Sequence, residues 1–155
     1  MRRADKEIIH LDTILKIVRD CEVCRLGLAV DSEPYVVPIS FGFDGESVYF
    51  HTAKEGKKIA MMTANPHVCV QFERNVELVT NDEDACTWTF NFESVIGFGV
   101  VTELNTDEAK IHGLNRIMRH YSGRDWSFEG PHMNATRVWR VDLESLTGKR
   151  SENKR

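Results

Sequence analysis

The sequence predicts a mainly β fold, in which a small antiparallel barrel carries helices on its outside. Three observations lead to this fold class. About six segments are rich in strand-forming residues, short turns separate them, and about three more segments have apolar residues at helical spacing. With 155 residues, 41% of them hydrophobic, the chain is long enough for one domain that buries its own core. We expect this domain at residues 1–148, followed by a frayed polar tail at 149–155.

The N-terminal part is expected to hold one helix and three antiparallel strands. Asp12 has the side chain of an N-cap, and the apolar residues after it keep helical spacing up to Asp20. Turn-forming residues around Pro34 and at Asp44-Gly45 then separate three β-rich segments. These strands are predicted at residues 23–30, 35–43 and 47–51.

A second helix is predicted after the third strand. Thr52 and Glu55 have the spacing of a capping box, in which side chains satisfy free N–H groups of the first helical turn. The helix should cover about residues 56–64 and end before Asn65, because the proline that follows disfavours helical backbone there. A strand at 68–72 and a weak strand or loop at 77–81 come next.

The C-terminal half combines a long β-rich segment, at 87–103, with a helix and a last strand, at 136–143. Gly97 and Gly99 predict a bend or bulge, as the corner of a barrel requires. A second capping box, Asn105 with Glu108, opens the helix, and Gly123 ends it. The apolar face of this helix consists of Ile111, Leu114, Ile117, Met118 and Tyr121.

The charge and the N-terminus exclude several classes of function. The net charge is −4 and the isoelectric point is about 5.9, so no basic field attracts nucleic acid. The charged N-terminus lacks the apolar core of a secretory signal, and no apolar run approaches the roughly 20 residues that cross a bilayer. We therefore expect a cytoplasmic protein with neither nucleic acid nor membrane as a partner.

Cys21 and Cys24 form a C-x-x-C pair, a spacing that zinc sites and redox sites use. A zinc site would require a second pair at short spacing, and Cys69 and Cys86 do not supply one. A redox pair of the thioredoxin type would open a helix after a strand, whereas this pair follows a predicted helix. We interpret the four cysteines as reduced structural thiols.

The segment from Ser47 to Lys58 gives the most specific chemical signal. It predicts a strand that runs into a helix N-terminus carrying a hydroxyl, a glycine and two lysines. Free N–H groups at a helix N-terminus bind phosphate, and the same partial positive charge disfavours Lys57 and Lys58 in the first turn. An anionic ligand would explain both lysines. The alternative is that both are solvated surface residues and that Thr52 is only a cap.

Pro38 lies inside a strand pattern, which predicts a strand edge or a bulge. Backbone groups freed there, beside Ser40, would address the polar edge of a flat ligand. The alternative is an interrupted strand without a ligand.

Among the six histidines, His51 is the candidate functional residue, because it ends a strand one residue before the phosphate-binding turn. His112 and His120 are too widely spaced for a metal pair, which normally lies about three or four residues apart on a helix. The motifs of serine hydrolases, zincins and Rossmann folds are absent from the sequence. We expect no metal site.

Taken together, these residues resemble the flavin-binding split-barrel superfamily that includes pyridoxamine 5'-phosphate oxidase, and most closely its nitroimidazole-resistance branch. The resemblance covers nearly the whole chain. The arginine-rich C-terminal substrate motif of true pyridoxamine phosphate oxidases is not evident, so vitamin B6 oxidation is not implied. The segments that carry the resemblance are residues 2–3, 24–28, 35–43, 49–58, 65–69, 94–99 and 146–149.

The resemblance implies a six-stranded antiparallel split β-barrel with flanking helices, which forms a homodimer with FMN at the subunit interface. Lys57 and Lys58, with Thr52, would hold the phosphate, and the segment from Pro38 to Phe41 would line the isoalloxazine ring. Gln71 and Ser94 would contact flavin from the interface, His51 would lie near the cofactor and Trp139 near the ring. The implied flavin-binding residues are thus Pro38, Ile39, Ser40, Phe41, His51, Thr52, Lys57, Lys58, Gln71, Ser94 and Trp139.

We therefore expect an FMN-dependent oxidoreductase that passes electrons from reduced flavin to a flat, electron-poor acceptor such as a nitroaromatic compound. His51 would act as the catalytic residue by orienting the acceptor or supplying a proton, since imidazole titrates near neutral pH. One alternative is a non-catalytic flavin- or haem-binding carrier, store or sensor, because the histidines leave axial ligation of haem open. Another is a dimeric interaction module with an empty cleft.

Overall fold

The computed structural model describes residues 3–153, apart from the side chains of residues 131 and 132. Arg2 and the last two residues of the expected tail lie outside this range. The elements in chain order are η1 (Ala4–Lys6), β1 (Glu7–Ile8), α1 (Leu11–Asp20), β2 (Cys24–Val30), β3 (Glu33–Ile39), β4 (Gly42–Phe43), β5 (Ser47–Thr52), α2 (Lys57–Ala64), β6 (His67–Val79), η2 (Ala85–Thr87), β7 (Thr89–Leu104), α3 (Asp107–Ser122), α4 (Pro131–Ala135) and β8 (Arg137–Ser151).

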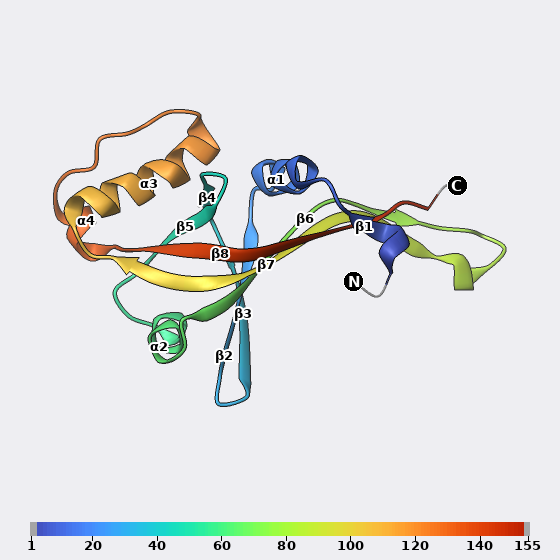
Figure 1. Ribbon diagram of the computed structural model, residues 1–155, viewed down its shortest axis with the longest axis horizontal. Helices are drawn as coiled ribbons and strands as arrows, with labels where there is room; N and C mark the ends of the chain where they lie inside the picture. Colours follow the sequence, from blue (N-terminus) through green and yellow to red (C-terminus); the bar gives the residue numbers. More distant parts are fainter. Residues whose placement is uncertain (1–2, 154–155) are drawn as a thin grey trace.

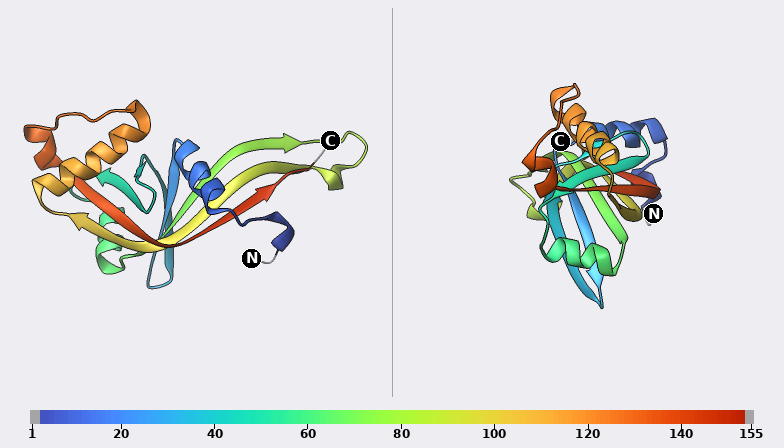
Figure 2. Two further views of the ribbon diagram at one scale, coloured as in Figure 1. Left: turned by 45° about the horizontal axis from the view of Figure 1, so that its top comes forward. Right: turned by 90° about the vertical axis from the view of Figure 1, so that its left-hand side faces the viewer.

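The predicted fold class is confirmed, because antiparallel strands of different lengths form one sheet with helices outside it (Figure 1). Within residues 3–153 the sheet has eight strands rather than six, in the order β3-β2-β6-β7-β8-β5-β4, with β1 paired to β8. Because β3 and β4 stand at opposite ends of this order, the β3 edge and the β4–β5 edge both remain open. Figures 1 and 2 show α2 and α3 at one end of the molecule, on opposite sides of the sheet, and the β6–β7 hairpin projecting from the other end.

Buried and outward-facing residues alternate along β2 and along the first part of β6. On β2, Cys24, Leu26 and Leu28 are buried, and on β6 Val68, Val70 and Phe72 are buried, while the residues between them face outward. Alternate residues of a strand point to opposite faces of the sheet. The inner face of the sheet therefore builds a single core, which α1 closes with Ile14, Ile17 and Val18.

The bend predicted from the two glycines of the long strand is present. The pairing of β7 with β8 shifts register between Phe98 and Gly99. A Cβ atom at Gly99 would lie 2.1 Å from the carbonyl oxygen of Asp142, so only glycine permits this close approach. The bulge lets β7 and β8 turn the sheet toward α3.

Three predicted helices are confirmed, with corrections at their starts. α1 begins at Leu11 and its N-cap position is His10 rather than Asp12. In α3 the cap is Thr106, one residue after the predicted Asn105, and its hydroxyl accepts a hydrogen bond from the Ala109 N–H. α3 ends as predicted, because Gly123 adopts a left-handed conformation after Ser122. The short helix α4 is not predicted from the sequence.

Three strand boundaries also differ from the prediction. The segment at 35–43 is divided into β3 and β4, and the strand expected at 68–72 continues to Val79. β8 continues to Ser151 instead of ending at residue 143, because Lys149 and Arg150 pair with Ser94 and Glu93 of β7. Residues 149–151 therefore belong to the sheet and not to a frayed tail.

A buried carboxylate ties the base of the β6–β7 hairpin together. Glu93, only 6% exposed, accepts hydrogen bonds from Arg74 Nε at 2.7 Å and from Arg150 Nε at 2.8 Å. Asn75 Nδ2 donates a third at 3.0 Å, and Arg74 also pairs with Asp20 of α1. Burial alone would raise the pKa of Glu93, but the two guanidinium groups outweigh it and hold the pKa below its ordinary value. This network joins β6, β7, β8 and α1.

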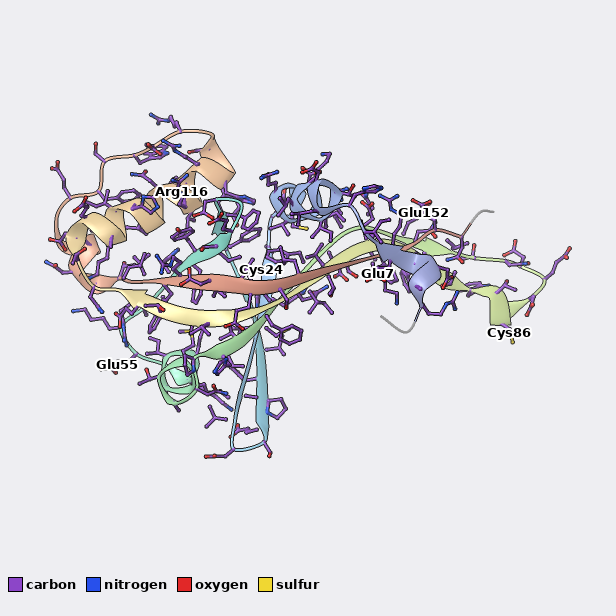
Figure 3. The ribbon with its side chains drawn as sticks, viewed as in Figure 1. Glu7, Cys24, Glu55, Cys86, Arg116 and Glu152 are labelled. Carbon is purple, nitrogen blue, oxygen red and sulfur yellow. The ribbon has the colours of Figure 1, made fainter. Side chains whose placement is uncertain are left out.

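The cysteines are free thiols in the structure, two of them buried. Burial raises the pKa of Cys21 and raises that of Cys24 to about 12. Such thiols are almost entirely protonated at neutral pH, as expected for structural cysteines. Cys86 is exposed and lies at the far end of the β6–β7 hairpin (Figure 3). None of the helices within residues 3–153 has the length and hydropathy needed to cross a membrane.

Candidate cofactor site

The connection from β5 to α2 forms the turn that the sequence singles out. α2 begins at Lys57 with Gly56 as N-cap, and no side chain caps its first turn. Gly56 has φ of 140°, a value that favours glycine. The predicted capping box of Thr52 and Glu55 is therefore wrong. The helix starts five residues after Thr52, and the N–H groups of its first turn remain uncapped by side chains.

Thr52 instead stabilises the end of β5 from inside the barrel. Its hydroxyl donates to the Ala53 carbonyl at 2.8 Å and accepts the Trp139 indole N–H at 3.0 Å. Trp139 is 4% exposed and lies parallel to the buried Phe50 at 6.5 Å between ring centroids. These contacts place Thr52 and Trp139 in the core, behind the turn.

His51 points to the opposite, outer face of β5, because successive side chains alternate along a strand. Desolvation, and then the charge of Lys58, lower the pKa of its imidazole. Desolvation also lowers the pKa of the Lys58 ammonium group. The charge of Lys58 therefore acts on His51, and no hydrogen bond or ion pair involves Lys58 within residues 3–153.

Lys57, by contrast, is directed away from this pair. Its ammonium group forms an ion pair with Glu33 of β3 and lies 4.9 Å from the ring centroid of Tyr35. The Glu33 carboxylate raises the pKa of Lys57. Of the two lysines in the first turn of α2, Lys57 thus has an acidic partner and Lys58 has none among the residues that the structure describes.

The segment from Pro38 to Phe41 lies where the open edge of β3 passes into β4. The expected edge position of Pro38 is confirmed, because within residues 3–153 β3 pairs with β2 alone. Ile39 and Phe41 are buried, and Ser40 between them is exposed. The Phe41 N–H donates to the Tyr121 hydroxyl at 3.0 Å. Ser40 therefore presents the free polar side chain of this segment.

Gln71 and Ser94 lie on the outer face of the sheet, separate from His51 and Lys58. Gln71 of β6 stands beside Arg25, which is paired with Pro38, and beside Ile96 of β7. Ser94 precedes Ile96 by two residues and so shares that face. The outward side chains of Val36, Ile96 and Phe98 are 64%, 40% and 55% exposed. This part of the sheet is an uncovered apolar face with polar groups along one side.

His51 also borders a pocket of about 380 Å³ beneath α3. Leu114, Ile117 and Met118 of α3 form one wall, and the connection to α4 forms the other. Sequence reasoning missed the second wall, because its apolar side chains have no regular spacing. These side chains are Phe128 and Met133, with Ser127, Glu129 and Thr136 beside them.

Comparison with known proteins agrees with this architecture. A family model described as pyridoxamine 5'-phosphate oxidase matches residues 11–150. The crystal structure of a candidate 5-nitroimidazole antibiotic resistance protein from Bacteroides thetaiotaomicron is 32% identical, with a TM-score of 0.81. The match covers 94% of this chain and 90% of that chain. Among curated proteins, none matches the chain.

More distant structures share the fold. The flavocytochrome Anf3 from Azotobacter vinelandii is 18% identical, covers 99% of this chain and 72% of that chain, and has a TM-score of 0.82. An FAD- and haem-binding protein from Mycobacterium smegmatis is 16% identical, with coverage of 96% and 74% and a TM-score of 0.83. The family match spans nearly all of the sheet and both edges described above. The chain belongs to the pyridoxamine 5'-phosphate oxidase family, in the branch that includes nitroimidazole-resistance proteins.

Proposed function

We propose that this protein binds FMN and passes electrons from reduced flavin to a flat, electron-poor acceptor of the nitroaromatic type. One observation carries the proposal. Lys58, a partly buried cation with no hydrogen bond or ion pair among residues 3–153, lies in the first turn of α2, which no side chain caps, and its charge acts on His51, in a chain that belongs to the pyridoxamine 5'-phosphate oxidase family. A structural neighbour with the same fold is an FAD-binding protein from Mesorhizobium loti.

The residues at the β5–α2 turn fit a phosphate group. A dianion there would offset the repulsion between Lys58 and a protonated His51, and would accept hydrogen bonds from the free N–H groups of α2. Lys57 contributes less, because its ammonium group is already paired with Glu33. Thr52 shapes the turn through its contacts with Ala53 and Trp139 rather than by direct binding.

In this proposal, the polar edge of the isoalloxazine ring lies against the open edge of β3. Ser40 offers a hydroxyl that is exposed and without a hydrogen-bond partner in the described part of the chain, and Pro38 cannot donate a backbone hydrogen bond that would close this edge. Ile39 and Phe41 anchor the segment from below because both are buried. FMN would thus extend between two open sheet edges that the chain itself leaves unpaired.

A second copy of the chain would complete the site. Gln71 and Ser94 lie on the outer sheet face, apart from the β5–α2 turn, so they would reach a flavin held by a partner subunit. Val36, Ile96 and Phe98 give that face the exposed apolar area typical of a protein interface. We therefore propose a homodimer with one FMN per subunit at the interface.

Bound FMN supplies the redox chemistry, while the protein positions the acceptor and manages protons. The pocket under α3 is mainly apolar and large enough for a small aromatic molecule. His51 at its border has a lowered pKa in the free protein, and its imidazole can donate a hydrogen bond to an acceptor oxygen or transfer a proton. A His51→Ala variant should retain flavin, because Lys58 still binds the phosphate, and should slow turnover per bound flavin. Loss of flavin with unchanged activity per bound flavin would reject this role.

The visible absorption spectrum of the purified protein tests the proposed cofactor. Flavin bands, with FMN released on heating, support the proposal. A strong Soret band would instead indicate a haem-binding carrier or sensor. A colourless protein that takes up no added FMN would reject flavin binding.

A further inference from the structure

The last turn of α3 holds the connection between β3 and β4 from outside the barrel. The Tyr121 hydroxyl donates a hydrogen bond to the Glu22 carbonyl at 2.6 Å and accepts one from the Phe41 N–H at 3.0 Å. One hydroxyl therefore links two backbone segments that are far apart in the sequence. Phe41 follows Ser40 directly in the chain. Glu22 lies just before β2, and the start of β2 pairs with the end of β3 next to Ser40.

Neighbouring contacts make this link rigid. His120 Nε2 lies 2.8 Å from the Cys21 carbonyl oxygen, and its ring lies 4.5 Å from that of Phe41. A Cβ atom at Gly42 would come within 2.3 Å of the backbone of Arg116, so α3 is pressed directly against β4 (Figure 3). The two residues that follow Ser40, Phe41 and Gly42, are thus held by α3.

The hydrogen-bond arrangement also decides which group remains for a ligand. The Phe41 N–H donates its hydrogen bond to the Tyr121 hydroxyl, and the Phe41 side chain is fully buried. The Ser40 hydroxyl is exposed and has no partner within residues 3–153. The Phe41 N–H belongs to the peptide group that joins Ser40 to Phe41, so its hydrogen bond to Tyr121 holds the backbone from which the Ser40 side chain extends.

We propose that Tyr121 is a positioning residue that aims the Ser40 hydroxyl at the polar edge of the flavin ring. The inference rests on the proposed flavin function. Added electrons increase the negative charge on that edge, so a fixed hydroxyl donor stabilises reduced flavin more than oxidised flavin. Tyr121 therefore acts on the redox balance of the cofactor without touching it.

A double-mutant cycle with Tyr121→Phe and Ser40→Ala tests the inference. The readout is the ratio of the Kd values for reduced and oxidised FMN, measured anaerobically by titration, together with the visible spectrum of the bound flavin. Each single variant should raise this ratio about fivefold, the effect of one neutral hydrogen bond. The double variant should show no further rise, because both changes remove the same interaction.

Tyr49→Phe is the matched control, since it removes a tyrosine hydroxyl from its hydrogen bond with Asp44, also beneath α3. It should leave the Kd ratio within about twofold of the parent value. A ratio unchanged in Tyr121→Phe, or effects of Tyr121 and Ser40 that add fully, would overturn the positioning role while leaving flavin binding intact. Failure of the parent protein to bind FMN would overturn both proposals together.

Discussion

Lys58, from the first turn of α2, acts electrostatically on His51 at the end of β5: its ammonium charge adds to desolvation in lowering the pKa of the imidazole. Neither side chain is neutralised by a carboxylate among the contacts of the described residues. Two groups that repel each other when charged gain from a shared anion. This pair is the part of the structure from which the flavin proposal follows most directly.

Lys58→Ala should weaken FMN binding about 30-fold, because it removes a charge-assisted hydrogen bond to the phosphate. Lys57→Ala is the matched variant in the same helical turn. It should weaken binding less than about threefold, since Lys57 is paired with Glu33. Fluorescence titration of FMN measures both values. Equal losses in the two variants would show that the ion pair with Glu33 does not hold Lys57 away from the ligand.

Inorganic phosphate should raise the pKa of His51. The free protein lowers this pKa through desolvation and Lys58, and a bound dianion favours the protonated imidazole. The shift can be followed by NMR titration of the His51 ring with and without phosphate. In Lys58→Ala the starting pKa should be higher and the phosphate effect smaller. An unchanged pKa in the parent protein would place the anion elsewhere.

Glu93→Gln should destabilise the fold by about 3 kcal/mol at pH 7, because the largely buried Arg74 and the partly exposed Arg150 lose their buried countercharge. Urea denaturation measures the loss. Glu152→Gln is the control, since Glu152 also pairs with Arg150 but is largely exposed, and it should cost less than about 1 kcal/mol.

The effect of Glu93 should depend on pH in a defined direction. Its pKa is lower in the folded state than the ordinary value of 4.5. Its stabilisation is therefore complete above that ordinary value and declines as the pH falls through the lowered value. The difference between the parent protein and Glu93→Gln should shrink in acid. A difference that stays constant from pH 7 to pH 3 would contradict the ionised pairing.

Gly42→Ala should destabilise the protein by about 3 kcal/mol, because the new methyl group would overlap the α3 backbone at Arg116. Gly27→Ala is the matched change within a strand. Its Cβ would lie 3.5 Å from Cys69, an ordinary contact, and we expect a change of less than about 1 kcal/mol. Thermal and urea unfolding compare the two variants. Similar stability of both would mean that α3 can move away from β4 at little cost.

Local sequence signals predicted much of the fold. Alternation along β2 and β6, the helical spacing of α1 and α3, and the glycine-dependent bulge at Gly99 are all properties of short windows. The capping box at Thr52 failed because the Trp139 indole, distant in the sequence, binds the hydroxyl that the pattern assigns to the helix. The tail prediction failed for a similar reason, since polar residues 149–151 pair with β7.

The sequence predicted which segments contribute to the candidate site, but not how their side chains are arranged in space. The sequence marks Lys57 and Lys58 equally, and only the position of Glu33 on β3 distinguishes them. Tyr121 reads as one apolar position of a helix, and nothing local shows that its hydroxyl reaches Phe41 and Glu22. The sequence likewise places Gln71 and Ser94 on strands without showing that they lie on the outer face, apart from His51.

Titration of the flavin-free protein with FMN and with riboflavin tests the central claim most directly, because the two ligands differ only in the phosphate. We predict saturation at one FMN per subunit, riboflavin binding at least about tenfold weaker, and loss of this difference in Lys58→Ala. Equal affinity for FMN and riboflavin in the parent protein, or binding of neither, would contradict a phosphate site at Lys58 and His51.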